Sequence, residues 1–303
     1  MSDKRACFDF EIDFLNGGGI QGQDFRLDIE SDDISEEALA AYIVADLRLL
    51  MVGAVRILNK RIIDEAHKRG EVKPAERRSG LKIIDLSHVI EAGMITYKGL
   101  PAPLICDHLS REQSRQHYAE GTEFQIDRIE MVGNTGTYLD TPYHRYADGY
   151  DLAGLDLERV SNSPGIVVRI EGSSDRAIDW TAFGASDVAG KAVLVHTGWD
   201  RHWCTDQYFE GHPYLTEAAA AHLRDRGAIL VGIDSFNIDT VDGNTRPVHS
   251  TLLAAGIPIV EHMTNLGALP VTGFRFTAAP PKVKAVGTFP VRAHAIIDPV
   301  GSA

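Results

Sequence analysis

Four short apolar runs after residue 80 limit most strongly how this chain can fold. They are LKIIDLS from Leu81, GIVVRI from Gly165, AVLVHTG from Ala192 and AILVGID from Ala228. Runs of this length and composition are typical of strands that are buried on both faces of a sheet. Because a helical stretch also lies among them, the sequence predicts an α/β domain built on a mixed sheet.

The helical stretch TEAAAAHLRDRG separates the last two of these runs. Thr216 stands where an N-cap side chain accepts a hydrogen bond from a backbone amide, and Gly227 stands where helices commonly end in a left-handed residue. We therefore expect one amphipathic helix between these two residues, packed against the strands.

Apolar residues alternate with acidic ones from Phe8 to Phe14. This period of two predicts a half-buried strand, which a turn at residues 17–19 (Gly-Gly-Gly) connects to a return strand in DFRLDIE, residues 24–30. Ser35 with two glutamates behind it then predicts the start of a helix. We expect this helix to continue to about Arg69, with a break at Gly53.

The polar segment GEVKPAERRSG, with one proline and two glycines, predicts a domain boundary. We place an N-terminal extension of hairpin and helix at residues 1–78 and expect it to contribute an oligomer contact. Residues 79–303 would form the main domain.

The charge balance excludes several classes of function. Lys and Arg number 30 against 43 Asp and Glu, a net charge of −13, which argues against nucleic-acid binding. The three cysteines, Cys7, Cys106 and Cys204, are too sparse for a disulfide scaffold or a thiolate zinc site. The N-terminus has no apolar signal-peptide core, and the apolar run at residues 42–58 carries three charges, so we expect no membrane span and a cytoplasmic protein.

The stretch NTGTYLDTPYH, residues 134–144, places a carboxylate and an imidazole in one short loop. Asp140 and His144 are suited to metal binding or to general acid–base chemistry. The alternative is structural, because an Asp-Thr-Pro turn can use its carboxylate to cap backbone amides.

A second polar pair flanks the apolar run STLLAAGIPIV. If this run is a helix that leads into a strand, His249 and Glu261 can face one cleft. A carboxylate inside an apolar stretch needs a partner to offset its desolvation. The structural alternative for Glu261 is an ion pair with Arg275 or Arg292.

A third feature is HTGWDRHW, residues 196–203, in which a strand ends in glycine and aromatic residues. Trp199 could wall a pocket for a small flat molecule, or it could be a core aromatic at the end of a strand. The sequence has no glycine-rich phosphate loop, no G-x-S-x-G nucleophile turn and no H-E-x-x-H helix.

Taken in order, these segments resemble the cyclase family, the metal-dependent hydrolases that include bacterial kynurenine formamidase and isatin hydrolase. The resemblance runs from about residue 82 to residue 296, through KIIDLSHVIEAGMITYKGLP, GNTGTYLDTPYHRYADG, VLVHTGWDRHW, YFEGHPYLTEAAAAHL, VGIDSFNID, HSTLLAAGIPIVEHMTNLGAL and FPVRAHAI. It implies the fold of that family, a mixed, barrel-like sheet flanked by helices.

The family signature is His-x-Gly-Thr-His-x-Asp-x-Pro-x-His. Its two early histidines and its aspartate bind zinc or manganese, and its last histidine is a general acid/base. In this chain Asn134 and Tyr138 stand at the two early histidine positions, whereas Asp140 and His144 match the signature. The resemblance therefore implies that two imidazole ligands of the family site are replaced here.

A distal histidine and glutamate complete the metal site of the formamidases, and they fall on His249 and Glu261. An amide oxygen and a phenol with a pKa of about 10 are poor replacements for imidazole ligands. The resemblance thus implies either one zinc or manganese ion held by Asp140, His249 and Glu261, or a site without metal.

These residues predict a hydrolase of a small cyclic or aromatic amide, lactam or lactone. His144 would be the acid/base, and Asp140 and Glu261 would hold the metal or position water. One alternative is a metal-independent lyase, isomerase or hydrolase that uses His144 and Tyr138 in the same pocket. The other is a non-catalytic protein that binds a small molecule.

Further residues are predicted to contact the substrate, namely Asn134, Thr137, Trp199 and His249. The predicted partner is a small molecule, with neither nucleic acid nor a membrane. The family resemblance also implies a homodimer or homotetramer.

Overall fold

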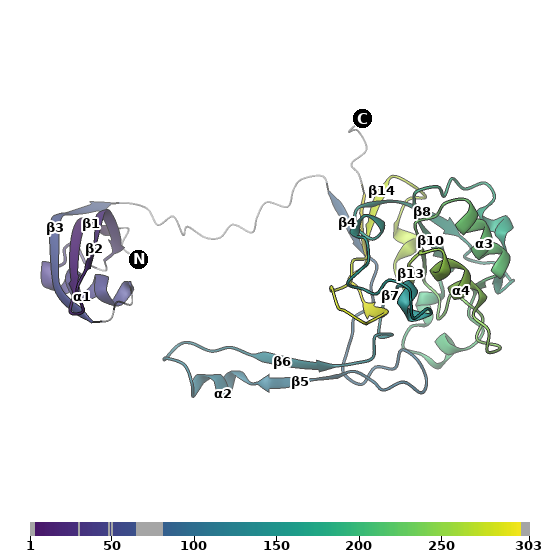
Figure 1. The fold of residues 1–303 in the computed structure, drawn as a ribbon, viewed down its shortest axis with the longest axis horizontal. Helices are drawn as coiled ribbons and strands as arrows, with labels where there is room; N and C mark the ends of the chain where they lie inside the picture. The colour runs from purple at the N-terminus through teal and green to yellow at the C-terminus, as the bar shows by residue number, and fades with distance from the viewer. Residues whose placement is uncertain (1–3, 30, 48, 50, 65–80, 298–303) are drawn as a thin grey trace. The chain divides into compact units, whose positions relative to one another are not determined.

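The computed structural model describes residues 4–29, 31–47, 49, 51–64 and 81–297. The chain divides into two compact units, residues 1–79 and 80–303 (Figure 1). The predicted boundary between residues 78 and 79 lies outside the described residues.

The N-terminal unit is a three-stranded antiparallel sheet with one helix. Its strands are β1 (Lys4–Phe14), β2 (Gly19–Asp28) and β3 (Val52–Asp64), in the order β2-β1-β3, and its helix is α1 (Glu36–Asp46). Phe8, Phe10 and Ile12 of β1 are buried together with Leu39 and Ile43 of α1. The alternation in β1 therefore supplies the sheet side of this core, as predicted.

The predicted start of α1 is confirmed, because the Ser35 side chain accepts a hydrogen bond from the backbone amide of Ala38. The predicted extension of this helix to Arg69 is wrong, since the chain from Val52 to Asp64 forms strand β3. The predicted residues 65–69 lie outside the described part of the chain.

Strand β3 forms because its β-branched residues pair with β1, with Val55 opposite Ile12 and Ile57 opposite Phe10. Val and Ile favour the pleated surface of a sheet over a helix. A two-stranded hairpin is marginally stable alone, whereas a third strand completes a surface that α1 can cover. The tertiary pairing thus overrides the helical interpretation of this segment.

The second unit is built on a nine-stranded mixed sheet. In sheet order its strands are β15 (Thr288–Pro290), β7 (Tyr138–Asp140), β13 (Ile259–Glu261), β12 (Leu230–Ile233), β10 (Ala192–His196), β8 (Ser163–Arg169), β14 (Phe274–Thr277), β16 (His294–Ile297) and β4 (Lys82–Asp85). The central strands β13, β12, β10 and β8 are parallel, and the outer strands pair antiparallel.

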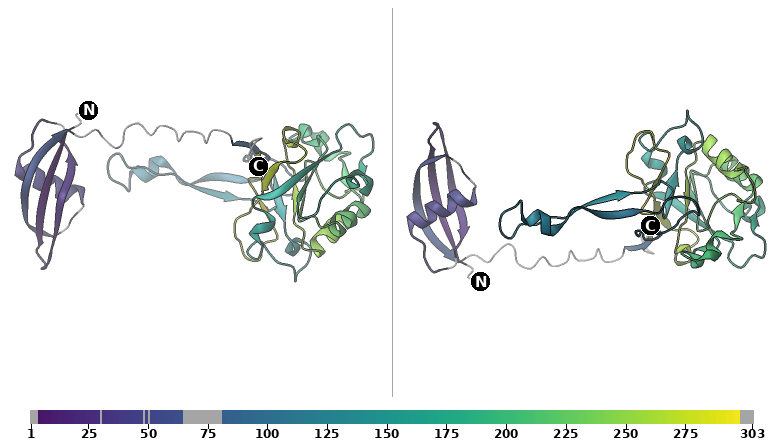
Figure 2. Two further views of the ribbon diagram at one scale, coloured as in Figure 1. Left: turned by 90° about the horizontal axis from the view of Figure 1, so that it is seen from above. Right: turned by 90° about the horizontal axis from the view of Figure 1, so that it is seen from below.

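Helices α3 (Glu217–Asp225) and α4 (Pro247–Ala254) pack on one face of this sheet (Figures 1 and 2). Their apolar residues meet the outward side chains of the central strands, for example Val193, Val195 and Ile233. The opposite face, with Val167 and Leu194, packs against residues from both ends of the curled sheet. The predicted mixed, barrel-like sheet with flanking helices is confirmed.

The predicted ends of α3 are also confirmed. The hydroxyl of Thr216 accepts a hydrogen bond from the amide of Ala219 at 3.1 Å, and Gly227 has a φ of 81° just after the helix. Shorter elements complete the unit: the paired strands β9 (Ala177–Ile178) and β11 (Tyr214–Leu215), and the 3-10 helices η1 (Pro142–His144), η2 (Leu157–Arg159), η3 (Trp180–Phe183), η4 (Trp199–His202), η5 (Asp206–Phe209) and η6 (Leu266–Ala268).

A two-stranded arm extends from the body of the second unit (Figures 1 and 2). It consists of β5 (Leu104–Leu109), the short helix α2 (Arg111–Arg115) and β6 (Ile126–Glu130). None of the helices described in the structure is long and apolar enough to cross a membrane.

Asp234 joins the ends of two central strands. Its buried carboxylate accepts hydrogen bonds from the amide and hydroxyl of Thr197, at 2.7 and 2.6 Å, and from the amide of Gly198 at 2.9 Å. Burial raises the pKa of Asp234 to about 7, although these hydrogen bonds oppose the increase. The carboxylate is therefore costly to keep charged in the folded protein.

This shift predicts how stability depends on pH. The folded-state pKa of Asp234 exceeds its unfolded value, so its contribution to the free energy of unfolding is complete below pH 4 and is lost as the pH rises to about 7. Between pH 5 and pH 8 we expect the free energy of unfolding of the wild type to fall by about 3 kcal/mol more than that of Asp234→Asn. Urea denaturation across this range measures both slopes. Asp175→Asn, at an exposed position, is the control, and equal slopes in wild type and Asp234→Asn would contradict the assignment.

Candidate active site

The stretch from Tyr138 to His144 lies at one end of the curled sheet. Residues 138–140 form strand β7, and Pro142 begins the 3-10 helix η1, which ends at His144. Strand β7 pairs antiparallel with β13, so that Tyr138 lies opposite Glu261. This pairing joins two segments that are more than one hundred residues apart in the sequence.

The predicted helix and strand around the second polar pair are confirmed. His249 lies in the first turn of α4, and Glu261 is the last residue of β13. Both side chains are almost completely buried. They line one cavity of about 410 Å³ together with Asn134, Tyr138 and His144. Five of the predicted site residues therefore converge on a shared space.

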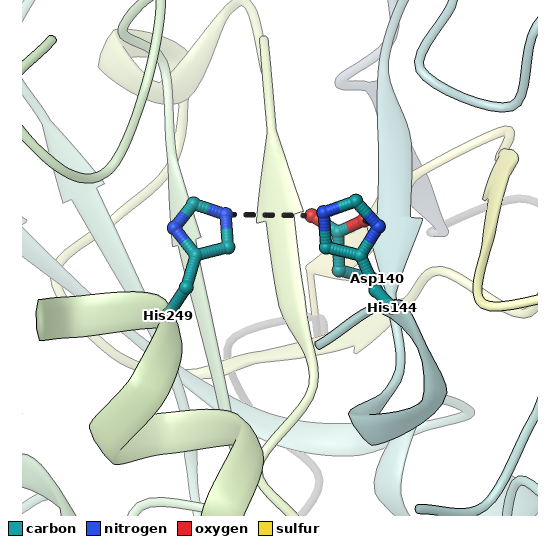
Figure 3. A group of neighbouring side chains, drawn as sticks. All are labelled: Asp140, His144 and His249. Atoms are coloured by element: carbon teal, nitrogen blue, oxygen red, sulfur yellow. Dashed lines mark ion pairs between the residues drawn. The ribbon is translucent and has the colours of Figure 1, made fainter. Parts of the chain in front are cut away.

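Asp140 lies beside this group at the buried end of the site. Oδ1 of Asp140 accepts a hydrogen bond from the hydroxyl of Thr288, whereas Oδ2 has no hydrogen-bond partner among the described residues. Nε2 of His249 lies 3.7 Å from Oδ2, as the dashed line in Figure 3 marks. A fully buried carboxylate oxygen without a hydrogen bond is rare and indicates a missing cationic or donor group.

His249 is held in place by a second carboxylate. Oδ2 of Asp239 lies 2.6 Å from Nδ1 of His249, and the same carboxylate accepts hydrogen bonds from the amides of Val248 and His249. Asp239 therefore caps the N-terminus of α4 and also fixes the orientation of the buried imidazole of His249. We assign the proton to Nδ1, because the carboxylate can only accept, which leaves Nε2 directed at Asp140 and Glu261.

Both carboxylate oxygens of Glu261 accept hydrogen bonds. Its Oε2 accepts from the hydroxyl of Tyr138 at 2.6 Å, and its Oε1 accepts from the amide of Ile238 at 2.6 Å. Oε1 also lies 3.8 Å from Nε2 of His249. Neither Arg275 nor Arg292 forms the alternative ion pair with Glu261, whose charged partner in the described part of the chain is His249, while Arg292 pairs with Asp85.

The cluster carries an excess of buried negative charge. Burial opposes charge on the imidazole, but Glu261, Asp140 and Asp239 outweigh it and raise the pKa of His249 to about 10. Burial likewise raises the pKa of Glu261 to about 7, against the attraction of His249. Each shift has the direction expected when carboxylates outnumber cations in a buried space. The cluster therefore favours a positive charge between Asp140 and Glu261.

His144 is connected to Asp140 through Thr288. Nδ1 of His144 lies 2.8 Å from the Thr288 hydroxyl, which donates its only proton to Asp140. Thr288 must therefore accept from Nδ1–H of His144, so we assign the lone pair of this imidazole to Nε2. The side chain of His144 is 36 % exposed and lines the cavity. This arrangement presents a basic nitrogen to a bound small molecule.

The donor atoms fit one divalent cation. Ligand atoms of Asp140, His144 and His249 lie within 4.8 Å of one another (Figure 3), and Oδ2 of Asp140 lacks a hydrogen-bond partner among the described residues. One carboxylate and two imidazoles with an open position are a normal ligand set for a catalytic metal. The set differs from the predicted one in a single member, because His144 belongs to this group and Glu261 instead binds Tyr138 and Ile238.

Two predicted substrate contacts lie outside the lining of the cavity. The hydroxyl of Thr137 donates to the backbone carbonyl of His262 and accepts from the amide of His88, so it connects two segments that are distant in the sequence. The indole of Trp199 donates to the backbone carbonyl of Tyr208, 3.0 Å away. Both side chains have structural contacts, and Trp199 is half-buried.

The use of Tyr138 in the metal-independent alternative also meets a constraint. Its hydroxyl proton is committed to Glu261, and burial, followed by the charge of Glu261, raises the pKa of the phenol well above its ordinary value. The phenol is thus a neutral hydrogen-bond donor and not a metal ligand at neutral pH.

Sequence reasoning missed several residues that complete the site. Asp239 and Thr288 orient the two imidazoles, while Tyr97 and Asn237 line the cavity and share a hydrogen bond of 2.5 Å. The Asn-Ile-Asp stretch after the buried strand was a detectable signal for Asn237 and Asp239, because polar residues at the end of a central strand often face a site. No comparable signal marks Thr288.

Carboxylates and imidazoles that converge on a small-molecule cavity, at the edge of a curled mixed sheet, define an enzyme of the hydrolytic type. The sequence model of the family described as Putative cyclase matches residues 84–240, just over half of the chain. The chain therefore belongs to the cyclase family, as its sequence resemblance predicted.

The relatives found by comparison are hydrolytic enzymes. The kynurenine formamidase of Geobacillus thermodenitrificans is 30 % identical over 184 residues, which cover 60 % of this chain and 84 % of the relative. That of Bacillus cereus is 26 % identical over 145 residues, covering 48 % of this chain and 67 % of the relative. The isatin hydrolase A of Labrenzia aggregata shares the fold, with a TM-score of 0.61, 20 % identity and coverage of 72 % of this chain and 94 % of that structure.

The contacts of Asp239 predict its effect on metal binding. Asparagine at this position keeps only one acceptor oxygen, so it cannot satisfy both the amides of α4 and Nδ1–H of His249. Loss of such an orienting partner typically weakens metal affinity about 10–100-fold. Calorimetric titration of metal-free Asp239→Asn with zinc or manganese measures the change. Asp156→Asn, which removes an aspartate cap at η2, is the matched control, and unchanged affinity in Asp239→Asn would refute the role.

Proposed function

We propose that this protein hydrolyses a C–N or C–O bond in a small cyclic or aromatic amide, lactam or lactone. The observation that carries the proposal is the basic Nε2 of His144 at the cavity, oriented through Thr288 by the buried Asp140. The names of the relatives, kynurenine formamidase and isatin hydrolase, support a hydrolysable small molecule. A cavity of about 410 Å³ is in the range of small-molecule sites.

The chemistry follows from the position of His144. Its Nε2 takes a proton from a water molecule as the water oxygen attacks the carbonyl carbon, and the carbonyl becomes an oxyanion. Collapse of this tetrahedral species breaks the bond to nitrogen or oxygen. The protonated imidazole then returns its proton to the leaving group, so that a carboxylate product and an amine or alcohol result. Asp140, acting through the Thr288 hydroxyl, keeps the imidazole in the required tautomer.

Asp140 and His249 are the residues that would hold one zinc or manganese ion, while His144, the third member of this group, keeps the lone pair of Nε2 for proton transfer. Such an ion supplies Lewis-acid polarisation of the carbonyl oxygen and lowers the pKa of water. Asp239 would keep His249 oriented toward it, and Glu261 would limit the rotation of the imidazole from the other side.

A metal-independent lyase, isomerase or hydrolase is the second candidate. It is favoured by the raised pKa of His249, to about 10, because an imidazolium could provide the positive charge that the carboxylates demand. Metal content and chelator treatment separate the candidates. Stoichiometric zinc or manganese whose removal abolishes turnover supports the first, whereas full turnover by metal-free protein supports the second. Binding without turnover across amides, lactones and hydroxy acids would indicate a non-catalytic protein.

Replacement of His144 by alanine tests the proposed base. General acid–base catalysis by one side chain contributes about 10²–10⁴-fold, so kcat/KM of His144→Ala should fall at least about a hundredfold. Steady-state hydrolysis of a substrate found in an amide and lactone panel measures it. The matched variant His294→Ala changes a histidine on β16, outside the cavity lining, and should retain activity. Near-normal turnover by His144→Ala would remove the proposed mechanism.

We also propose that the protein is a homo-oligomer and that the arm of β5, α2 and β6 contributes to the interface. Apolar side chains are exposed along this arm, among them Phe124, Ile126 and Ile129. A lone hairpin with such residues in water is marginally stable and typically marks a protein contact.

Serine at Ile126 and Ile129 together should therefore shift the protein toward monomer without loss of the main fold. Light scattering coupled to size-exclusion chromatography gives the mass, and the melting transition followed by circular dichroism reports on the fold. Val271→Ser, an exposed apolar residue outside the arm, is the matched control. An unchanged oligomeric mass in the double variant would exclude the arm from the interface.

A further inference from the structure

We propose that Arg145 and Arg246 form an anion subsite at the rim of the cavity, and that the substrate is a small amide or ester that carries a carboxylate remote from the bond to be broken. This inference rests on the proposed hydrolytic function and deepens it by naming the substrate class. Both arginines line the same cavity as His144, His249 and Glu261.

The guanidinium of Arg246 is fixed on one side and open on the other. Its Nη1 donates to the backbone carbonyls of Thr240, Gly243 and Thr245, at 3.3, 2.9 and 2.7 Å. Nε and Nη2 have no hydrogen-bond partner among the described residues. A planar fork that is held by one nitrogen loses little conformational freedom when its other donors bind an oxyanion.

Arg145 is tied to the same rim through one serine. Nε of Arg145 donates to the hydroxyl of Ser250 at 3.3 Å, and this hydroxyl donates to the backbone carbonyl of Arg246 at 2.8 Å. The two terminal nitrogens of Arg145 have no partner in the described part of the chain. Ser250 thus links the two arginines, and each keeps donors that can bind a ligand.

The absence of acidic partners is notable in so acidic a protein. The chain has 43 acidic and 30 basic residues, and many of its surface cations form ion pairs, such as Arg176 with Asp242. Within the described residues, neither Arg145 nor Arg246 has a carboxylate at ion-pair distance. Arginines that face a cavity without a counter-charge are suited to an anion from solution.

The negative charge at the buried end of the cavity and the positive charge at its rim would orient such a ligand. Glu261 lines the cavity, and the buried Asp140 and Asp239 lie 3.7 and 2.6 Å from His249, which also lines it, so a free carboxylate is repelled there. Arg145 is exposed and Arg246 half-buried, which places positive charge toward solvent. A substrate with one carboxylate can therefore bind with that group at the rim and its neutral carbonyl near His144.

A carboxylate fits this subsite better than a phosphate. Both match the planar donor fork of arginine. A phosphate monoester, however, carries close to two negative charges at neutral pH, which increases its repulsion from the three carboxylates and from a protein of net charge −13. We therefore assign the subsite to a monoanionic carboxylate.

Matched substrates test this assignment by turnover. N-formyl and N-acetyl anilides with a ring carboxylate are compared with the corresponding ring carboxamides, which are neutral and nearly isosteric. We expect kcat/KM to be about tenfold to a hundredfold higher for the carboxylates in wild type. In Arg145→Gln and Arg246→Gln the ratio of the two forms should fall toward one, mainly through KM. Arg226→Gln, an exposed arginine outside the cavity, makes the same change in net charge and should keep the wild-type ratio.

Direct binding separates failure of the subsite from failure of the proposed reaction. Benzoate, benzamide and phenyl phosphate are titrated into wild type and the three variants by calorimetry, which requires no turnover. Benzoate binding that weakens in Arg145→Gln and Arg246→Gln, and not in Arg226→Gln, supports the subsite even if no anilide is hydrolysed. Equal binding of benzoate by all four proteins, or tighter binding of phenyl phosphate than of benzoate, would overturn the assignment. A carboxylate-to-carboxamide ratio near one for a hydrolysed wild-type substrate would overturn it as well.

Discussion

The site depends on three buried carboxylates that surround one imidazole. Asp140, Asp239 and Glu261 all approach His249, and no lysine or arginine among the described residues forms an ion pair with any of the three. Isolated buried carboxylates are strongly disfavoured, so this group persists only if protons, hydrogen bonds or a cation offset the charge. Backbone amides at Ile238, Val248 and His249, together with the Tyr138 hydroxyl, supply part of that compensation. The remaining oxygen, Oδ2 of Asp140, has no such compensation, and for this reason it is the atom best placed to meet a cation.

The fold creates this concentration of charge through pairing at the end of a sheet. Strand β13 is parallel to its inner neighbour β12 and antiparallel to β7 on the other side, so that one strand brings Glu261 against Tyr138 while β12 ends in the loop that carries Asp239. Asp239 caps the first turn of helix α4, and the same turn carries His249. The burial of apolar side chains on both faces of the sheet offsets the free-energy cost of this charged cluster.

Tyr138 shows how one side chain determines the use of a neighbouring carboxylate. The sequence resemblance implies an imidazole ligand at this position, whereas here the phenol donates to Glu261 and stays protonated. Glu261 is thereby engaged by hydrogen bonds, and the group of donor atoms that fits a metal ion consists of Asp140, His144 and His249. The cavity that remains has an acidic floor and a basic rim, a polarity that discriminates among small molecules by the position of their charge.

The sequence by itself determined the local elements and the chemistry available to them. Apolar runs and capping residues predicted the central strands and helix α3, because these signals are local. The convergence of Asp140, His144, His249 and Glu261 was implied by the resemblance to the cyclase family. Only the tertiary structure decided that residues 52–64 join a sheet, since pairing with β1 outweighs a helical interpretation of the segment. It also decided that Asp239 and Thr288 orient the imidazoles and that Arg145 and Arg246 meet at one rim. Those partners are set by non-local strand pairing and loop geometry, and a hydrogen bond across such a distance leaves no periodic signal in the chain.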